Sequence, residues 1–500
     1  MRPNTYITLA LLILLPFALF QGCASTAQQQ TVAVTDRPEE FQRFYAALDG
    51  VVRTYKVGEA SDFPVDEFPY LRTNRFLAAI KDRIMDEERA QVWVEQMLSL
   101  DLKARKKEIS NLPGQGFAAL ADTLGGISSR EDLMANLEFY ANRFLAHDRR
   151  QPGFYEAVKA GVNISGEYST AMRTFGLYPV AYYPVVSATK KKYDIFRGWH
   201  QNPLEKLEVD GSISVFAPPR RDAVSPEALY ALFSAAGRDA LGRPDLTETE
   251  LKQLISAYAP VIYQDVAAGY DFFGKIRWQN DQVTIDYQNH TVYYYVTYGF
   301  INGAPALQLN YAFWYSGRWG ENAPRIERGP LDGVTVRITL DSQGRPIMLD
   351  IMNNCGCYYF SVPRKEKVAQ VVASSNALYP FVPTWLPESF PHDRLSLRIN
   401  SGWHQIQHVY AREVPSDALT YQLLPYDVLE ALPKNDRTTE SVFTPEGIMK
   451  DSSRIEPYIF FSMGIPKVGY MRQRGHHAIK LIGKAHFTDP DLFDNNFIFE

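Results

Sequence analysis

The feature that most constrains the fold is a change in the spacing of apolar residues near residue 280. Before it, apolar side chains recur at helical spacing, behind typical helix caps such as Ser129 and Thr247. After it, apolar and polar residues alternate, as in Val334–Leu340. Helices and strands in separate parts of a chain predict an α+β fold. We therefore expect a mainly helical region over residues 36–265, followed by an antiparallel β-rich region over residues 266–500.

Local patterns mark individual elements within these regions. Caps and apolar faces predict helices over residues 36–48, 87–112, 129–144, 168–175 and 247–258, with another starting at Ser225-Pro226. Alternation and Tyr/Val-rich runs predict strands over residues 283–287, 291–300, 306–315, 334–340, 347–352, 395–410 and 455–462. The run Lys190–Lys192 indicates a solvated turn.

The start of the chain resembles a secretory signal peptide over residues 1–22. Arg2 supplies a positive end, and the run from Tyr6 to Phe20 is apolar but short for a membrane-spanning helix. Cys23 follows Gly22 directly, which resembles the lipobox of bacterial lipoproteins. In that family the Cys is acylated, the signal is removed before it, and the lipid anchors the protein in a membrane.

Some residues around Cys23 depart from the usual lipobox. Phe20 and Gln21 stand where Leu and a small residue are usual, so the alternative is an ordinary secretion signal with an incidental Cys. Residues 23–35 are small or polar and carry no charge, which predicts a flexible tether. Because Ala24 rather than Asp follows the Cys, the resemblance implies an outer-membrane location, with the protein facing the periplasm.

The composition argues against a nucleic-acid partner. The chain has 52 basic and 57 acidic residues, and it has no stripe of Lys and Arg with interleaved aromatics. Once Cys23 is acylated, only Cys355 and Cys357 are left of the three cysteines. The fold must therefore depend on buried apolar surface rather than on a framework of disulfides.

The pair Cys355-Gly356-Cys357 is the strongest local candidate for chemistry. Two thiolates this close can bind a soft or borderline ion such as zinc or copper, because Gly356 lets the backbone turn around it. The same pair can form a strained, easily reduced disulfide. The remaining alternative is two thiols without a role, since Cys is often buried.

Histidines in the second half could complete a metal site. His404 and His408 are four apart in an expected strand, where they would share one face, and His476 and His477 are adjacent. A site with Cys355 and Cys357 needs His404 and His408, or one of His476 and His477, as further ligands. The alternative is that these histidines are ordinary surface or core residues.

Residues 291–319 are rich in aromatics and suggest a binding face. Alternate side chains of a strand point to opposite sides, so one set can fill the core while the other binds a peptide, sugar or glycan strand. The candidates for such a face are Tyr293, Tyr295, Trp314, Arg318 and Trp319. Core packing is the alternative use of these aromatics.

Three short stretches, Asn354-Cys-Gly-Cys-Tyr358, Pro69-Tyr-Leu-Arg72 and Asn74-Arg-Phe-Leu77, resemble a group of predicted lipoproteins of Gram-negative bacteria. The resemblance covers most of the chain after the signal. It brings no mechanism, because no activity is assigned to the group. A His follows the Cys-Gly-Cys-Tyr of the group where this chain has Tyr359, which removes one metal ligand that the group would supply.

Two classes of function follow from these observations. The first is a membrane-anchored envelope lipoprotein that binds or scaffolds an envelope protein or glycan. The second is a metal-dependent or thiol-redox envelope enzyme with its site in the C-terminal half. The Cys pair and the clustered histidines favour the enzyme. The lack of a nucleophile elbow, a phosphate-binding loop or a haem-attachment motif favours the binding protein.

Overall fold

A computed structural model describes residues 38–84, 86–219, 224–435 and 437–500 of the chain. The predicted signal peptide, Cys23 and the tether lie outside the described residues. Residues 39–500 form one compact unit that combines helices with antiparallel and mixed sheets, so the predicted α+β class is confirmed.

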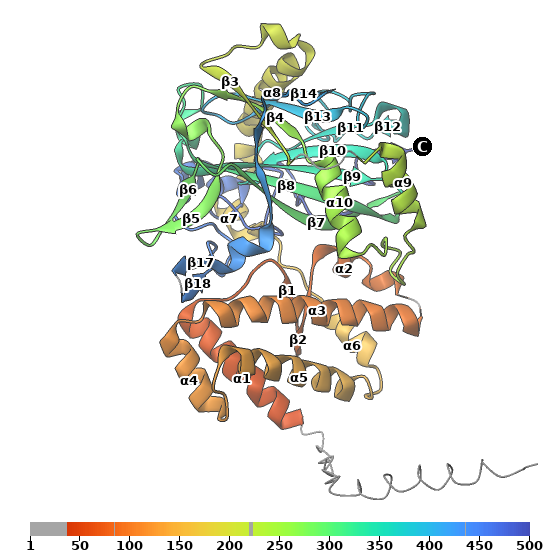
Figure 1. Ribbon diagram of the computed structural model, residues 1–500, viewed down its shortest axis with the longest axis vertical. Coiled ribbons are helices and arrows are strands. Elements are labelled where there is room, and N and C mark those ends of the chain that lie inside the picture. Colours follow the sequence, from red (N-terminus) through yellow and green to blue (C-terminus); the bar gives the residue numbers. More distant parts are fainter. Residues whose placement is uncertain (1–37, 85, 220–223, 436) are drawn as a thin grey trace, which may run out of the picture. The chain divides into compact units, whose positions relative to one another are not determined.

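Helices from the first part of the chain form a layer below the sheets (Figure 1). The layer consists of α1 (Pro38–Tyr55), α3 (Glu87–Asn111), α4 (Gly114–Leu124), α5 (Arg130–Asp148) and α6 (Phe154–Gly161). As the sequence predicts, Ser129 caps α5 by accepting a hydrogen bond from Asp132 N at 3.0 Å. Asp86 caps α3 in the same way by accepting from Arg89 N at 2.8 Å. The layer has its own apolar core around Trp93.

Short elements connect this layer to the sheets. They are the hairpin of β1 (Phe63–Val65) and β2 (Phe68–Thr73), followed by α2 (Arg75–Ala79).

Four more helices follow in the chain. They are α7 (Thr170–Phe175) and α8 (Tyr178–Gln201), then α9 (Pro226–Ala235) and α10 (Glu248–Tyr258). Ser225 and the Thr247–Glu250 capping box start α9 and α10 as predicted.

The larger sheet is mostly an antiparallel meander. Its order is β11 (Phe360–Pro363), β10 (Pro346–Asn353), β9 (Gly329–Leu340), β8 (Ala304–Arg318), β7 (Thr291–Ile301) and β16 (Gln422–Pro425), with β16 parallel to β7. The strands predicted over 291–300, 306–315, 334–340 and 347–352 are thereby confirmed.

A second, mixed sheet covers one face of the meander. Its order is β14 (Ile406–Arg412), β13 (Arg394–Ile399), β4 (Val261–Val266), β3 (Ser212–Ala217) and β15 (Leu419–Thr420). Buried residues of both sheets, such as Val336 and Leu397, meet in one core. Because β4 includes residues 265 and 266, the predicted boundary between the helical and the β-rich regions lies inside one folded unit.

Smaller two-stranded sheets complete the second half. They are β5 (Lys275–Gln279) with β6 (Gln282–Asp286), β12 (Val368–Val371) with β19 (Phe497–Phe499), and β17 (Leu432–Asn435) with β18 (Thr438–Glu440). The helix α11 (Glu456–Ile459) precedes the last long loops. In the part of the chain that the structure describes, no helix combines the length and the apolar character needed to cross a membrane.

Three local predictions are wrong. Residues 395–410 form a hairpin instead of one strand, because the chain turns at Gly402, where φ is +67°. Residues 455–462 form α11 and a short 3₁₀ helix instead of a strand. Lys190–Lys192 lie within α8, whose start at Leu177 lacks a side-chain cap and whose interior contains Pro184.

Candidate functional site

A cavity of about 230 Å³, which we call the dithiol cavity, contains the pair Cys355 and Cys357. Its walls come from α8, from the loop after β10, and from the segments around α11 and residues 478–481. Most of these walls are apolar. The polar groups that line the cavity are Cys355 and Cys357, the carboxyl groups of Glu327 and Glu456, the amino groups of Lys192 and Lys480, and the hydroxyl groups of Thr189 and four tyrosines. A small apolar pocket with a few convergent polar groups is typical of a ligand site.

A tight turn after β10 carries both thiols. Gly356 N donates to Asn353 O at 2.7 Å, and Asn353 N donates to Cys357 O at 2.9 Å. Gly356 has φ +86°, and a Cβ atom there would lie 2.3 Å from the carbonyl oxygen of Ala478. Only glycine fits this position, so the turn fixes Cys355 and Cys357 on the cavity wall.

The two cysteines are free thiols in different electrostatic surroundings. The hydrogen bond between the two thiol groups, together with burial, raises the pKa of Cys357 well above its ordinary value. Cys355 lies close enough to the guanidinium groups of Arg318 and Arg454 to interact with their charges. Cys355 Sγ also accepts a hydrogen bond from Cys357 N at 3.4 Å. The raised pKa keeps the proton on Cys357, whereas Cys355, which accepts the Cys357 N–H and lies near two guanidinium groups, is the thiol placed to act as the nucleophile.

Glu456 supplies a titratable carboxyl group to the same cavity. Burial, and then the charge of Glu327, raises the pKa of Glu456 to about 7, while Arg318 and Arg454 act in the opposite direction. The negative charge of Glu456 is also one of the causes that raise the pKa of Cys357. Glu456 can therefore hold or release a proton beside the thiols near neutral pH.

Behind the cavity, Glu327 begins a chain of buried charges. It accepts hydrogen bonds from Arg318 Nη1 at 2.7 Å, from Trp403 Nε1 at 2.9 Å and from the Tyr358 hydroxyl. Arg318 also donates to both oxygens of Asp332, at 3.0 and 2.9 Å. This bidentate pairing holds the guanidinium rigidly next to Cys355.

His404 ends this chain deep in the fold. Its Nδ1 lies 2.8 Å from Asp332 Oδ2 and its Nε2 lies 3.2 Å from Asp271 Oδ1, so both nitrogens donate to carboxylates. Burial alone would lower the pKa of His404, but these hydrogen bonds outweigh burial and raise the pKa. The ring stacks on Tyr315 with 3.9 Å between centroids. His404 is thus a buried imidazolium that balances two carboxylates.

The other predicted histidines lie in different places. His408 Nδ1 donates to Trp199 O at 3.3 Å. His476 bonds to Glu167 at 2.8 Å and to Ala60 O at 2.6 Å. His477 is buried, and burial, followed by the charge of Arg472, lowers its pKa to about 3, so the ring is neutral.

These positions leave the predicted metal ligands apart. Among the residues that the structure describes, no group of three or more His, Cys, Asp or Glu side chains is arranged to hold a metal ion. Of the six predicted ligands, only Cys355 and Cys357 line the dithiol cavity. Both ring nitrogens of His404 already donate hydrogen bonds to carboxylates. The six residues are therefore not brought together as one ligand set.

Most of the predicted aromatic face lies in the core. Tyr293, Tyr295, Trp314 and Arg318 are at most 5 % exposed. The hairpin of β5 and β6 covers Tyr293, whose hydroxyl accepts a hydrogen bond from Ile276 N at 3.0 Å. Trp319 is the exception, with 47 % exposure just beyond the end of β8. The prediction of a binding face is therefore wrong for Tyr293, Tyr295, Trp314 and Arg318, which pack in the core, and only Trp319 is exposed.

Several residues of the site carry no sequence signal. Glu327, Glu456 and Lys192 lie in segments far apart in the sequence, and no fixed spacing relates them. Asp332 is the partial exception, because the hairpin register of β8 and β9 places it opposite Tyr315 and near Arg318. Charged residues inside a strand pair that is otherwise apolar could have suggested a buried ion pair.

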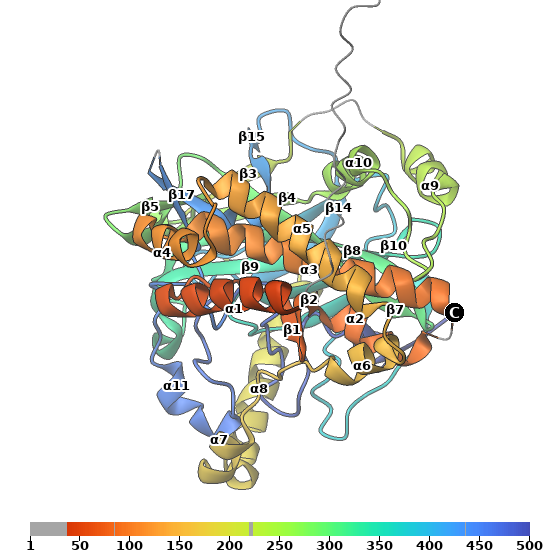
Figure 2. The same cartoon turned by 90° about the horizontal axis from the view of Figure 1, so that it is seen from below.

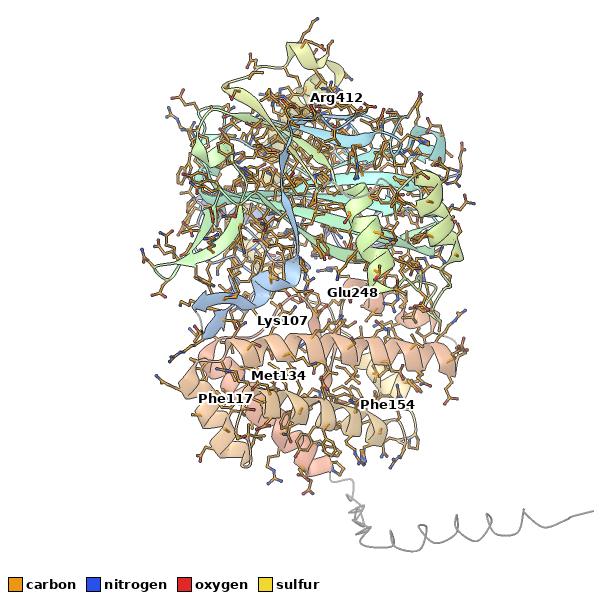
Figure 3. All side chains as sticks on the ribbon, in the orientation of Figure 1. Lys107, Phe117, Met134, Phe154, Glu248 and Arg412 are labelled. Carbon is orange, nitrogen blue, oxygen red and sulfur yellow. The ribbon has the colours of Figure 1, made fainter. Side chains whose placement is uncertain are left out.

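A larger cavity of about 820 Å³ lies between the helical layer and the C-terminal loops. Its charged groups are largely taken up by one another, as in the pair between Arg72 Nη2 and Glu108 Oε1 at 2.7 Å. Near it, Lys107 of α3 pairs with Glu430 where the layer meets the β region (Figure 3). These ion pairs mainly join the helical layer to the sheets. We therefore take the cavity that contains Cys355 and Cys357 as the candidate functional site.

Comparison of the chain with protein-family models, with curated proteins and with solved structures found no match.

Proposed function

We propose that the protein is a lipid-anchored envelope protein that performs thiol–disulfide chemistry with Cys355 and Cys357. One observation carries the proposal. Two free thiols share one small cavity, in which Cys355 lies near the guanidinium groups of Arg318 and Arg454 and the pKa of Cys357 is raised. The membrane anchor follows from the expected acylation of Cys23, and the location in the outer membrane, facing the periplasm, follows from Ala24 after it.

The reaction needs both thiols. The Cys355 thiolate attacks one sulfur of a substrate disulfide, a mixed disulfide forms, and the other substrate sulfur leaves as a thiolate that takes up a proton. Cys357 then loses its proton and attacks Cys355 Sγ. This step releases the second substrate thiol and leaves a Cys355–Cys357 disulfide. In total, two electrons pass from the cysteines to the substrate.

Glu456 is suited to the proton transfers. With a pKa of about 7, its carboxyl group can give a proton to the leaving substrate thiolate and can later accept the proton of Cys357. Lys192 lies 4.2 Å from the centre of the Trp403 ring and also lines the cavity. Its ammonium group balances part of the negative charge of Glu327.

The binding or scaffolding role has less support from the described residues. Four of its five aromatic and Arg candidates lie in the core, so they cannot touch an envelope protein or a glycan. A metal-dependent reaction also has less support, because the proposed ligands are dispersed.

Trapping of the mixed disulfide tests the proposal. The mature lipoprotein, extracted in detergent, is exposed to a small aromatic disulfide that releases a coloured thiolate. Cys357→Ser should keep the substrate bound to Cys355, because nothing resolves the mixed disulfide. Cys355→Ser should react at least about tenfold more slowly, because burial and the charges of Glu456 and Glu327 still raise the pKa of the remaining thiol.

The double variant Cys355→Ser/Cys357→Ser is the matched control and should release no coloured thiolate, because acylated Cys23 has no free thiol. The unmodified protein should release two equivalents of coloured thiolate and end with a Cys355–Cys357 disulfide. Retention of substrate on both cysteines, which also releases two equivalents but leaves no Cys355–Cys357 disulfide, would contradict the proposed exchange.

A further inference from the structure

One end of the unit exposes an unusual set of large apolar side chains. The set, which we call the apolar surface, consists of Phe175, Leu177, Val180, Tyr183, Tyr458 and Ile459. Their exposed fractions run from 49 % to 87 %. Exposed apolar patches of this kind mark interaction sites in soluble domains.

The segments that carry the apolar surface are firmly packed. Helices α7, α8 and α11 lie together at one end of the unit (Figure 2). Ser169 N donates to Gly464 O at 2.7 Å, and Arg173 Nε donates to Met463 O at 2.9 Å. A Cβ atom on Gly176 would lie only 2.5 Å from Ser462 Cα. The backbone that carries the apolar surface is therefore held in place, and its apolar side chains point to the outside of the unit.

The charged residues of these segments are nearly all cationic. Residues 168–192, 455–470 and 478–484 contain seven Lys and Arg residues and a single acidic residue, Glu456. Glu456 is buried in the dithiol cavity, whereas Lys467 and Lys484 are exposed. Aromatic and aliphatic side chains next to lysines are the composition of surfaces that lie in a lipid headgroup region.

The apolar surface borders the dithiol cavity. Val185 and Lys192 of α8, Phe460 just after α11, and Lys480 all line that cavity. A bilayer in contact with the apolar surface would therefore lie next to the cavity walls. Amphiphilic molecules could then pass from lipid into the cavity without crossing water.

We propose that the apolar surface docks on an anionic phospholipid bilayer and thereby brings the dithiol cavity to the membrane. The proposal rests on the lipid anchor and the dithiol site proposed above. The anchor keeps the unit near a bilayer, since a tether of about a dozen residues reaches about 40 Å when extended. The tether itself is polar, so it offers no apolar segment to cover this surface.

Site-specific quenching tests the docking. The mature lipoprotein is reconstituted into vesicles of phosphatidylglycerol and phosphatidylcholine, with and without bromine on the acyl chains. Tryptophan is introduced by Tyr458→Trp and, in a second protein, by Tyr183→Trp. The matched control is Tyr287→Trp, an exposed tyrosine just after β6. The emission that each substitution adds is compared between the two kinds of vesicle.

We expect brominated lipid to quench the emission added by Tyr458→Trp and Tyr183→Trp at least twofold, and to leave that of Tyr287→Trp unchanged. Loss of the quenching when Lys467→Glu and Lys484→Glu are added would further support the anionic bilayer as partner. Equal quenching at all three positions, or none at position 458, would overturn the proposal. So would concentration-dependent self-association in detergent that shields positions 183 and 458.

The test separates this inference from the proposed function. The variant Cys355→Ser/Cys357→Ser should be quenched as strongly as the protein with both thiols, because the cysteines do not contribute to the apolar surface. Failure of the thiol chemistry therefore leaves the quenching result intact. If the lipid on Cys23 did not anchor the protein, the protein would instead separate from the vesicles on flotation.

Discussion

At the scale of single residues, the buried imidazolium of His404 stabilises the fold by its charge. It lies fully buried between Asp332 and Asp271, and its φ of +54° is uncommon for a residue with a Cβ atom. We predict that His404→Gln lowers the free energy of unfolding by about 3–5 kcal/mol, because the variant removes the cation that Asp271 and Asp332 share, and only Asp332 keeps its ion pair with Arg318. Urea denaturation measures this change. The exposed His392 provides the control, and His392→Gln should change stability by less than about 0.5 kcal/mol.

The effect of His404 should depend on pH with a definite sign. Its pKa is raised in the folded state, so the folded protein binds the proton more tightly than the unfolded chain does. The stabilisation is fully present below the unfolded value of about 6.5 and is lost as the pH rises through the folded pKa. The difference between the protein and His404→Gln should therefore shrink toward alkaline pH. A difference that grows with pH would contradict the imidazolium assignment.

At the scale of elements, the turn after β10 determines the thiol geometry. Gly356→Ala must both accept φ +86° and displace the carbonyl of Ala478. Gly303→Ala is a matched control, because Gly303 has φ +73° and nothing lies within 4 Å of its Cβ position. We predict that Gly303→Ala costs about 1–2 kcal/mol from the backbone alone.

Gly356→Ala should cost clearly more than this control and should also change the rate at which Cys355 is alkylated. Urea denaturation and thiol labelling of both variants measure the two effects. Equal costs for the two variants, with unchanged labelling, would mean that the contact with Ala478 does not hold the turn.

The elements also show what a sequence can and cannot predict. Caps such as Thr247 and alternation such as Val334–Leu340 act within a few residues, so the helices and the meander could be predicted from the sequence. Helix α8 has no side-chain cap and contains Pro184, so local signals argued against it, and packing against the sheets overrides them. In the site, Cys355 and Cys357 stood out by their spacing. Glu327 and Glu456 did not, because only the tertiary fold brings them to the cysteines, and Asp332 did so only in part, through the register of β8 and β9.

At the scale of the whole molecule, the expected anchor links the folded unit to a membrane. We predict that Cys23→Ser leaves the chain without its lipid and makes it extractable from membranes without detergent, as measured by fractionation of cells. Cys355→Ser/Cys357→Ser is the control and should stay with the membrane. Retention of Cys23→Ser in the membrane fraction after the signal has been removed would point to another anchor.

The order in which the two thiols react tests the central claim most directly. The unmodified protein is treated with substoichiometric iodoacetamide at pH 7, and peptide fragmentation by mass spectrometry locates the label. Exposure alone would favour Cys357, since Cys355 is only 5 % exposed and Cys357 is partly exposed. Because Cys355 lies near two guanidinium groups and the raised pKa of Cys357 keeps that thiol protonated, the account predicts that Cys355 is labelled first, by at least about tenfold. Preferential labelling of Cys357 would contradict the account.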